Sequence, residues 1–273
     1  MGFNRRRHLG GNTGFNAGKF GNSIIGGDTL SSIFSSYNAI SMWSAENLDI
    51  SGTTTTALDY AGIYDLVNPA ATNQPTFNAA SANFNSKPSL SFTTDDVLTK
   101  FTGWRVADTS GVIVSVYRST VGGTVLTHTL SLSSSVTTNI YTTTLVRSNL
   151  FNPTIKRGGT TNDIRTDISM GAAGTDPMVT AYRGDGVDYA VFGSSGEGVI
   201  TSIQGGGADN GDWFTPDLVG ADTLAIGGLN NGASGIGSWG YGEIEWCATL
   251  YLPYTTDATI VNCINELNAY YGI

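Results

Sequence analysis

Two glutamates near the end of the chain have the residue type and spacing that acid–base chemistry needs. Glu243 and Glu245 are one residue apart in a stretch that alternates apolar and polar side chains. On a β-strand, residues i and i+2 point to the same face, so both carboxylates would lie side by side. Retaining glycoside hydrolases use two carboxylates roughly 5 Å apart, one as nucleophile and one as acid. The pair therefore predicts either a glycosidase-like site or an ordinary acidic face of a sheet.

A second acidic pair, Asp95 and Asp96, raises the question of a metal ion. Calcium prefers carboxylate and carbonyl oxygens, so this pair is a weak candidate for a calcium site. Further oxygen donors are missing nearby in the sequence. Aspartates also stabilise tight turns by accepting hydrogen bonds from the backbone. We favour the turn and expect no cofactor, with calcium as the open alternative.

Aromatic residues near glycine-rich loops are the third candidate. Trp213, Trp239 and Tyr241 lie in or beside such loops. Exposed rings there would stack on sugars and bind glycans, whereas buried rings would belong to the core or to subunit contacts. We favour the core or subunit role. The tripeptide Arg183–Asp185 spells an integrin-type recognition motif, but three residues match by chance, so we expect a plain turn.

Several other chemistries lack the residues that they require. The chain has two histidines, and none of its residues shows metal-ligand spacing. A serine–histidine–acid set, a phosphate-binding loop and a dinucleotide fingerprint are also missing. Cys247 and Cys263 are too few for a disulfide framework, and we expect two reduced, partly buried thiols. These observations argue against an enzyme.

The charge distribution singles out the N-terminal segment. The net charge is -9, yet four basic residues precede the first acid, Asp28. A cationic arm on an acidic body docks on an acidic partner, either a protein surface or nucleic acid. Since no nucleic-acid-binding module is recognisable, we favour a protein surface. The residues predicted to dock are Arg5, Arg6, Arg7, Phe15, Lys19 and Phe20.

The elements that position these residues are mostly strands. With 36 glycines and 13% charged residues, the 273-residue chain favours short strands joined by turns. Residues 111–118, 124–132, 137–146, 178–182, 188–192 and 224–228 read as strands. Residues 1–36 form an extended Gly/Asn-rich arm, whose last residues from Leu30 can form a turn of helix, and residues 37–273 form one domain. The prediction is an all-β, antiparallel two-sheet sandwich with this arm and one short C-terminal helix.

That C-terminal ending is the most specific part of the pattern. Ile244, Trp246, Ala248, Leu250 and Leu252 alternate along one predicted strand, so they are expected on one face. Pro253 ends the strand because it cannot donate a ladder hydrogen bond. Thr255 or Thr256 is expected to cap the following helix, with Asp257 at the positive end of its dipole. The predicted apolar stripe of that helix consists of Ile260, Ile264, Leu267 and Tyr271.

Six segments, in order, resemble the laminin-G-like, concanavalin-A-like lectin/glucanase jelly roll of bacteriophage virion proteins. They are residues 39–46 with Trp43, residues 63–66, residues 85–92 with a Lys-Pro pair, residues 94–98 with Asp95 and Asp96, residues 224–228, and the C-terminal strand and helix. The resemblance covers residues 39–273 and implies the jelly-roll fold. One departure is Thr259, which stands where the family often has the glutamate of a helix capping box. The fold hosts lectins, hydrolases and inert modules, so it does not imply one activity.

The resemblance also bears on Glu243 and Glu245. Glucanases of this architecture carry a third acid on the same strand face, where this chain has Cys247 and Thr249. We therefore interpret the two glutamates as acidic residues of an edge-of-sheet strand, and expect no enzymatic activity.

The function that these observations favour is a structural protein of a bacteriophage virion, such as a head fibre, a capsid decoration or a tail-associated adhesin. Its arm would dock on capsid, portal or tail proteins, and it would form a homo-oligomer. Because the basic start is followed by glycines rather than an apolar segment, no export signal is expected, and assembly would occur in the host cytoplasm. The alternatives are a carbohydrate-binding module for host surface glycans and, less favoured, a glycoside hydrolase. No membrane association is expected.

Overall fold

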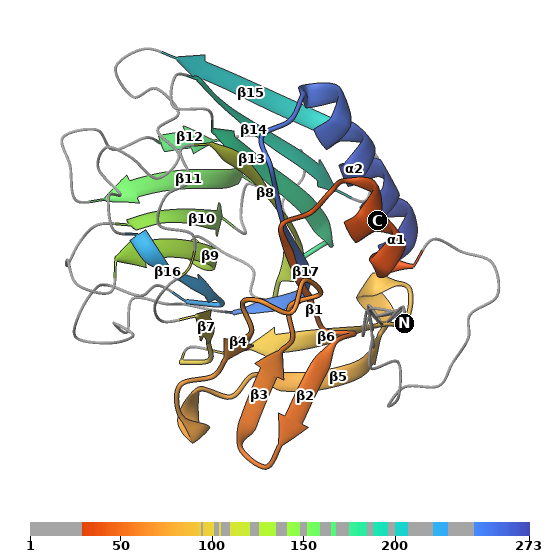
Figure 1. Cartoon of the computed structure of the whole chain (residues 1–273), viewed down its shortest axis with the longest axis vertical. Coiled ribbons are helices and arrows are strands. Elements are labelled where there is room, and N and C mark those ends of the chain that lie inside the picture. The colour runs from red at the N-terminus through yellow and green to blue at the C-terminus, as the bar shows by residue number, and fades with distance from the viewer. Residues whose placement is uncertain are drawn as a thin grey trace, which may run out of the picture.

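Two antiparallel β-sheets face each other in the computed structural model, and two helices cover the outer side of one sheet (Figure 1). The structure describes residues 29–93, 95–100, 104, 110–120, 126–134, 141–147, 152–158, 165–167, 175–184, 188–195, 200–206, 221–228 and 243–273. Every pairing between described strands is antiparallel. The predicted all-β two-sheet sandwich with a short C-terminal helix is confirmed.

The first sheet has eight described strands, with β17 (Ile244–Leu252) in its middle. On one side β17 pairs with β8, and on the other with β6 and then β1. The other strands of this sheet are β1 (Ser41–Ser44), β5 (Thr76–Ser81), β6 (Lys87–Phe92), β8 (Gly111–Ser119), β13 (Met178–Gly184), β14 (Asp188–Ser195) and β15 (Ile200–Gly206).

The second sheet has nine described strands, in the order β12-β11-β10-β9-β16-β7-β4-β3-β2. They are β2 (Leu48–Ser51), β3 (Thr54–Ala57), β4 (Leu66–Val67), β7 (Leu98–Lys100), β9 (Leu126–Ser134), β10 (Tyr141–Arg147), β11 (Asn152–Gly158), β12 (Arg165–Asp167) and β16 (Ala221–Ile226). Each of the ranges predicted as strands, 111–118, 124–132, 137–146, 178–182, 188–192 and 224–228, overlaps a strand of the structure: β8, β9, β10, β13, β14 and β16, respectively. Residues 124–125 and 137–140 of these ranges lie outside the described residues. Two 3₁₀ turns, η1 (Ala71–Asn73) and η2 (Ala82–Phe84), flank β5.

The inner core fills the space between the sheets. Large aromatic side chains dominate it, including Trp43, Trp104 and Trp246, each at most 1% exposed. The Phe92 and Trp246 rings meet edge to face at 6.5 Å, an arrangement that stabilises beyond simple burial. The two sheets are therefore joined by a packed apolar layer.

A second core lies on the outer side of the eight-stranded sheet. Helices α1 (Leu30–Ser36) and α2 (Asp257–Tyr271) pack there against β8, β13, β14 and β17. The stripe predicted for α2 is confirmed, since Ile260, Ile264, Leu267 and Tyr271 are all buried. Strands β13 and β17 are buried along their whole length, and β8 at every residue except Arg118, because both of their faces are covered.

Both helices begin with a threonine cap. The Thr256 hydroxyl accepts from the Thr259 N–H at 3.3 Å, and the two threonine hydroxyls are 3.0 Å apart. Thr259, which stands where the family often has glutamate, therefore contacts the cap residue Thr256. Thr29 caps α1 in the same way. Among the described residues, no helix is long and apolar enough to cross a membrane.

Helix α1 changes the boundary drawn for the arm. The sequence placed residues 29–36 in an extended segment, with a turn of helix at its end, but they form a capped helix whose Leu30 and Ile33 are buried in the outer core. Apolar side chains at i and i+3 give this short helix one buried face, so it belongs to the body. The remainder of the predicted arm, residues 1–28, lies outside the described residues.

A β-bulge at Cys247 divides β17 into two halves. Trp246 pairs with Tyr117 of β8, but Ala248 pairs with Val116, so Cys247 is an extra residue. Ile244 and Trp246 therefore face the inner core, whereas Ala248, Leu250 and Leu252 face the helices. The prediction that these five residues share one face is wrong, because a single inserted residue reverses the alternation.

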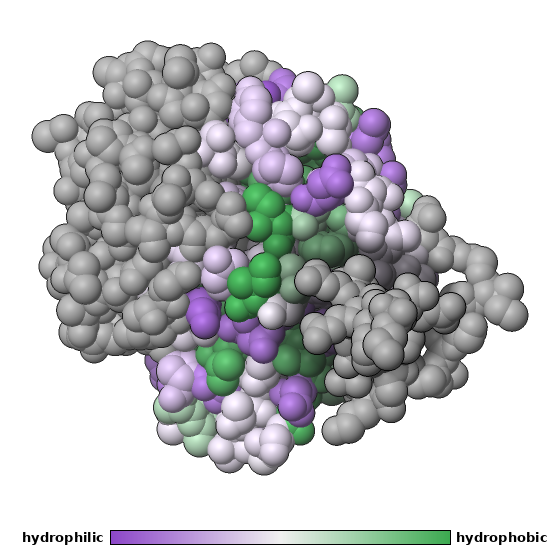
Figure 2. All heavy atoms as spheres, viewed as in Figure 1, coloured by the Kyte–Doolittle hydropathy of each residue, from purple (hydrophilic) through white to green (hydrophobic). Residues whose placement is uncertain are grey.

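On the face in Figure 2, hydrophobic residues (green) gather in the middle of the view, in the region where Figure 1 draws β8 and β17. Hydrophilic residues (purple) lie around them.

Candidate functional site

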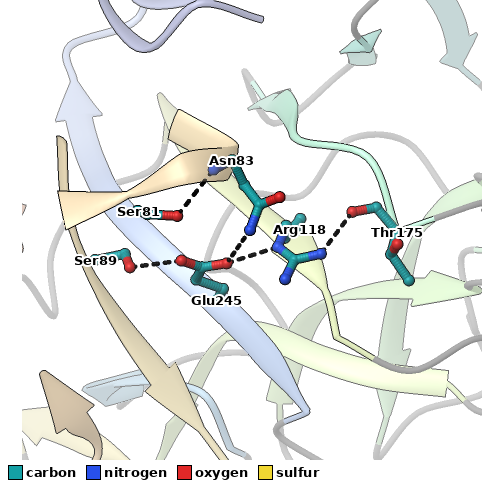
Figure 3. A network of polar contacts seen from close by, with 6 residues as sticks. All are labelled: Ser81, Asn83, Ser89, Arg118, Thr175 and Glu245. Carbon is teal, nitrogen blue, oxygen red and sulfur yellow. Dashed lines mark hydrogen bonds and ion pairs between the residues drawn. The ribbon is translucent and has the colours of Figure 1, made fainter. Parts of the chain in front are cut away.

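The Glu245 carboxylate is enclosed by a network of polar groups (Figure 3). Its Oε2 accepts from Arg118 Nε at 2.6 Å and from Asn83 Nδ2 at 3.1 Å, and its Oε1 accepts from the Ser89 hydroxyl at 2.6 Å. Arg118 also donates to the Thr175 carbonyl oxygen at 3.1 Å. Glu245 as a whole is 3% exposed. Its acceptor capacity is largely used by protein donors.

This environment keeps Glu245 charged. Burial alone would raise the pKa of its carboxyl, but the nearby hydroxyls of Ser81 and Ser89, together with Arg118, outweigh burial and hold the pKa below its ordinary value. A general acid needs the opposite shift, so that it still carries a proton at neutral pH. Glu245 therefore has the properties of a structural anion.

The two glutamates are not the edge-strand residues that the sequence indicated. β17 lies between β8 and β6, in the middle of its sheet. Its two faces are covered by the inner core and by the helices. Glu243 precedes the strand, and its carbonyl accepts from the Thr120 N–H at 2.9 Å. The Arg118 partner was missed, although β8 and β17 each carry one charged residue among uncharged ones, which was a usable signal.

Asp96 stabilises a turn, as the favoured interpretation predicted. Its carboxylate accepts from both the N–H and the hydroxyl of Thr93, each at 2.8 Å. The backbone carbonyl of Asp95 accepts from the Asn73 side chain. No group of three or more possible metal ligands occurs in the parts of the chain that the structure describes.

A second organising turn was missed at the sequence level. The buried Asp59 carboxylate accepts from the backbone N–H groups of Met42, Ala61 and Tyr64 at 3.0–3.1 Å. It joins strand β1 to the loop before β4, which contains part of the segment 63–66 that resembles the family. Such a carboxylate satisfies several backbone donors at once.

A different cluster lies where α2 ends, and it brings together residues from four separate segments. Glu46 follows β1, Tyr60 follows β3, Lys87 opens β6 and Tyr270 belongs to the last turn of α2. The Tyr270 hydroxyl lies 2.8 Å from both carboxylate oxygens of Glu46. The Lys87 ammonium lies over the Tyr270 ring, 3.8 Å from its centre, in a cation–π contact. We call these four residues the Glu46 cluster.

The electrostatics of the Glu46 cluster are opposite to those around Glu245. Burial raises the pKa of Glu46 more than the Tyr270 hydroxyl and the Lys87 charge lower it. Burial is also the main reason that the pKa of Tyr60 rises to about 12, and its hydroxyl lies 3.2 Å from that of Ser44. All four side chains are half-buried and reach solvent. A perturbed carboxylate with solvent access is a typical feature of binding and catalytic sites.

The two cysteines behave as predicted, as free thiols, and both are buried. Burial raises the pKa of Cys247, with further contributions from Glu245 and Glu46, and raises that of Cys263 to about 12. Neither has the lowered pKa of a nucleophile.

Arg183 does not present a recognition tripeptide. It is 8% exposed, pairs with the Asp257 carboxylate at the start of α2, and stacks on Tyr254 at 5.6 Å. Its position on β13 thus fixes the N-terminal end of α2 to the sheet.

The remaining predicted site residues lie outside the described residues. These are the docking residues Arg5, Arg6, Arg7, Phe15, Lys19 and Phe20, and the aromatic residues Trp213, Trp239 and Tyr241.

Comparisons with known proteins define the fold. No family model matches the chain, and no curated protein matches its sequence. An arabinofuranosidase bound to arabinofuranosyl-α-1,2-xylobiose has a similar structure, with a TM-score of 0.58 and 11% identity, over 88% of this chain and 64% of the enzyme chain. The enzymatically active domain of a bacteriophage CBA120 tailspike protein is also similar, with a TM-score of 0.53 and 13% identity. The match covers 76% of this chain and 30% of the tailspike chain.

A third similar structure is the CBM40 of a Ruminococcus gnavus sialidase bound to α2,3-sialyllactose, with a TM-score of 0.47 and 12% identity. It covers 64% of this chain and 95% of the module. At such identities the likenesses concern the fold alone. The arabinofuranosidase and the tailspike domain agree with the predicted β-sandwich fold, and the finer resemblance to phage virion proteins stays a prediction.

Proposed function

We propose that this chain is a non-enzymatic protein of a bacteriophage virion that displays a lectin-like β-sandwich. The observation that carries the non-enzymatic part is the state of Glu245. Its carboxylate is held by Arg118, Ser89 and Asn83, is almost wholly buried and has a lowered pKa. A substrate would have to displace a charged partner to reach it.

The virion assignment is supported by two observations. The fold is similar to a domain of a phage tailspike, and the basic segment before Asp28 differs in charge from the acidic remainder. In this proposal the basic segment docks on capsid, portal or tail proteins, and the sandwich projects outward as part of a homo-oligomer.

Deleting residues 1–28 tests the docking role. The cut leaves Thr29 to cap α1 and keeps the buried Leu30, so the body is expected to fold as before. The full chain should sediment with purified particles, and the truncated chain should remain free while keeping its melting temperature. Normal co-sedimentation of the truncated chain would exclude an anchoring arm.

Carbohydrate binding is the second candidate function, and the Glu46 cluster favours it. Similar folds occur in a sialidase module bound to sialyllactose and in an arabinofuranosidase bound to an oligosaccharide. A glycan array with the purified protein, with and without a calcium chelator, tests this function. No binding to any glycan would leave the structural role alone.

Glycoside hydrolysis is the third and least favoured candidate. Incubation with β-glucans and arabinoxylans should release no reducing sugar. Release that disappears in Glu243→Gln or Glu245→Gln would contradict the non-enzymatic proposal.

A further inference from the structure

The Glu46 cluster contains a donor and an acceptor that the described protein does not fully use. Both Glu46 oxygens face the same Tyr270 hydroxyl, which has one proton to donate, whereas a carboxylate can accept about four hydrogen bonds. The Lys87 ammonium has three N–H donors, and its contact among the described residues is the Tyr270 ring. Hydrogen-bonding capacity of both kinds therefore lies side by side.

Packing holds the Tyr270 ring of the cluster in place. The Tyr270 ring lies under Lys87 and meets the Tyr271 ring edge to face at 5.0 Å, and Tyr271 meets Phe84 at 6.1 Å in the same manner. Tyr271 is fully buried, and its hydroxyl has no hydrogen-bond partner among the described residues. Packing thus restrains Tyr270, which contacts both Glu46 and Lys87, and a pair that is restrained before binding loses less entropy when it binds a ligand.

We propose that Glu46 and Lys87 form the polar contact of a carbohydrate site, in which two neighbouring hydroxyls of a neutral sugar bridge the carboxylate and the ammonium. One hydroxyl donates to Glu46 and the other accepts from Lys87. This inference rests on the carbohydrate-binding function proposed above and names its site. It does not use Trp213, Trp239 or Tyr241.

The opposite charges of Glu46 and Lys87 favour a neutral diol over other ligands. Lys87 would attract an anion but Glu46 would repel it. Glu46 would attract a cation but Lys87 would repel it. A hydroxyl can donate to one group and accept from the other, so it suits both without adding charge. The partly buried setting strengthens such hydrogen bonds, because water competes less there.

Two variants of the pair and one matched control test the site. Glu46→Gln removes the charge at nearly constant shape, and Lys87→Met removes the ammonium while keeping an apolar stem. Glu266→Gln is the control, because Glu266 lies on the same helix as Tyr270 and also accepts from a tyrosine, Tyr37, at 2.8 Å, but forms no ion pair with a lysine among the described residues. Each variant is first compared with the wild type by melting temperature.

The wild-type protein is screened on an array of neutral glycans, and the best binder is then titrated into all four proteins. We expect Glu46→Gln and Lys87→Met to weaken binding at least tenfold, and Glu266→Gln to leave it unchanged. Equal binding by all four would place the sugar elsewhere and overturn this site while leaving carbohydrate binding in place. Failure of the wild type to bind any neutral glycan would overturn this site, and failure to bind any glycan at all, charged or neutral, would overturn carbohydrate binding as well.

A second measurement needs no variant. Reductive methylation of the wild-type protein, followed by peptide mass analysis, reports the access of reagent to Lys87. The bound glycan should protect Lys87 and leave Lys100 of β7 as reactive as before. Unchanged methylation of Lys87 at saturating glycan would overturn the site even where a variant fails to fold.

Discussion

Glu245 and Glu46 lie close to the same buried thiol, that of Cys247, yet the molecule surrounds them in opposite ways. Glu245 meets Arg118, Ser89 and Asn83, and its pKa is lowered. Glu46 meets a single tyrosine hydroxyl and lies near one lysine, and burial raises its pKa. Protein donors occupy most hydrogen-bond acceptor sites of the Glu245 carboxylate, whereas the Glu46 carboxylate keeps unoccupied acceptor sites that reach solvent.

The two hydrogen-bond environments distinguish a structural acid from a candidate binding acid in this fold. A buried carboxylate whose acceptor sites are filled stabilises the strands that supply its donors. A half-buried carboxylate with unfilled sites contributes less to stability, and it can interact with a ligand. The sequence marked Glu245 for chemistry, whereas Glu46 entered only as the last residue of the segment 39–46 that resembles the family, with no binding role.

The largest expected effect comes from breaking the saturated pair. Arg118→Met should lower the free energy of unfolding by about 3 kcal/mol, because it leaves the Glu245 charge buried without its cation. Urea denaturation followed by tryptophan fluorescence measures the loss. Lys87→Met is the matched control and should cost less than about 1 kcal/mol, since Lys87 reaches solvent. Equal losses for the two variants would erase the proposed distinction.

The pH dependence of stability should separate the two acids by sign. The pKa of Glu245 is lowered on folding, so its contribution is present above the ordinary value of 4.5 and is lost as the pH falls through its folded pKa. The pKa of Glu46 is raised, so its contribution is present below 4.5 and is lost as the pH rises through its folded pKa.

Unfolding free energies measured from pH 3 to pH 7 for the wild type, Glu245→Gln and Glu46→Gln test these signs. The stability difference between wild type and Glu245→Gln should shrink toward low pH. The difference between wild type and Glu46→Gln should shift against the wild type as the pH rises. Parallel curves for the two variants would contradict the assignment.

A smaller effect is expected for the hydroxyl that links α2 to Glu46. Tyr270→Phe removes the one hydrogen bond to that carboxylate and should cost about 1 kcal/mol. Tyr37→Phe removes the similar bond to Glu266 and gives the comparison on the same helix. A much larger loss for Tyr270 would mean that the Glu46 cluster is mainly structural.

The smallest effect is expected one residue further on. The Tyr271 hydroxyl is buried without a hydrogen-bond partner among the described residues, so Tyr271→Phe should leave stability unchanged or raise it by up to about 1 kcal/mol. Thermal unfolding of Tyr271→Phe beside Tyr270→Phe checks this. A clear loss would show that the hydroxyl has a partner, such as a buried water molecule.

The sequence predicted the strands well because their signals are local. β-Branched content identified β8, the glycines at 227–228 indicated the end of β16, and a 3.6-residue stripe identified α2. The bulge at Cys247 was not predictable, because it occurs where the neighbour of β17 changes from β6 to β1. That change depends on segments far away in the sequence.

The same reason limited the prediction of sites. Arg118 and Glu245 become neighbours only through strand pairing, and the Glu46 cluster needs four segments to meet. The hydrogen bonds of a turn join residues that are close in sequence, so the role of Asp96 could be predicted. Periodicity indicates which face a residue takes, but not which partners share that face.

The central position of β17 has a consequence for how the chain folds. Its pairing with β1 joins residues roughly 200 positions apart, and contacts of such separation slow folding because a long loop must close first. Until β17 arrives, β8, β6 and β1 expose unpaired edges and the apolar faces that the helices later cover. During synthesis the earlier strands must therefore wait, and in that interval they are prone to aggregate or to require a chaperone.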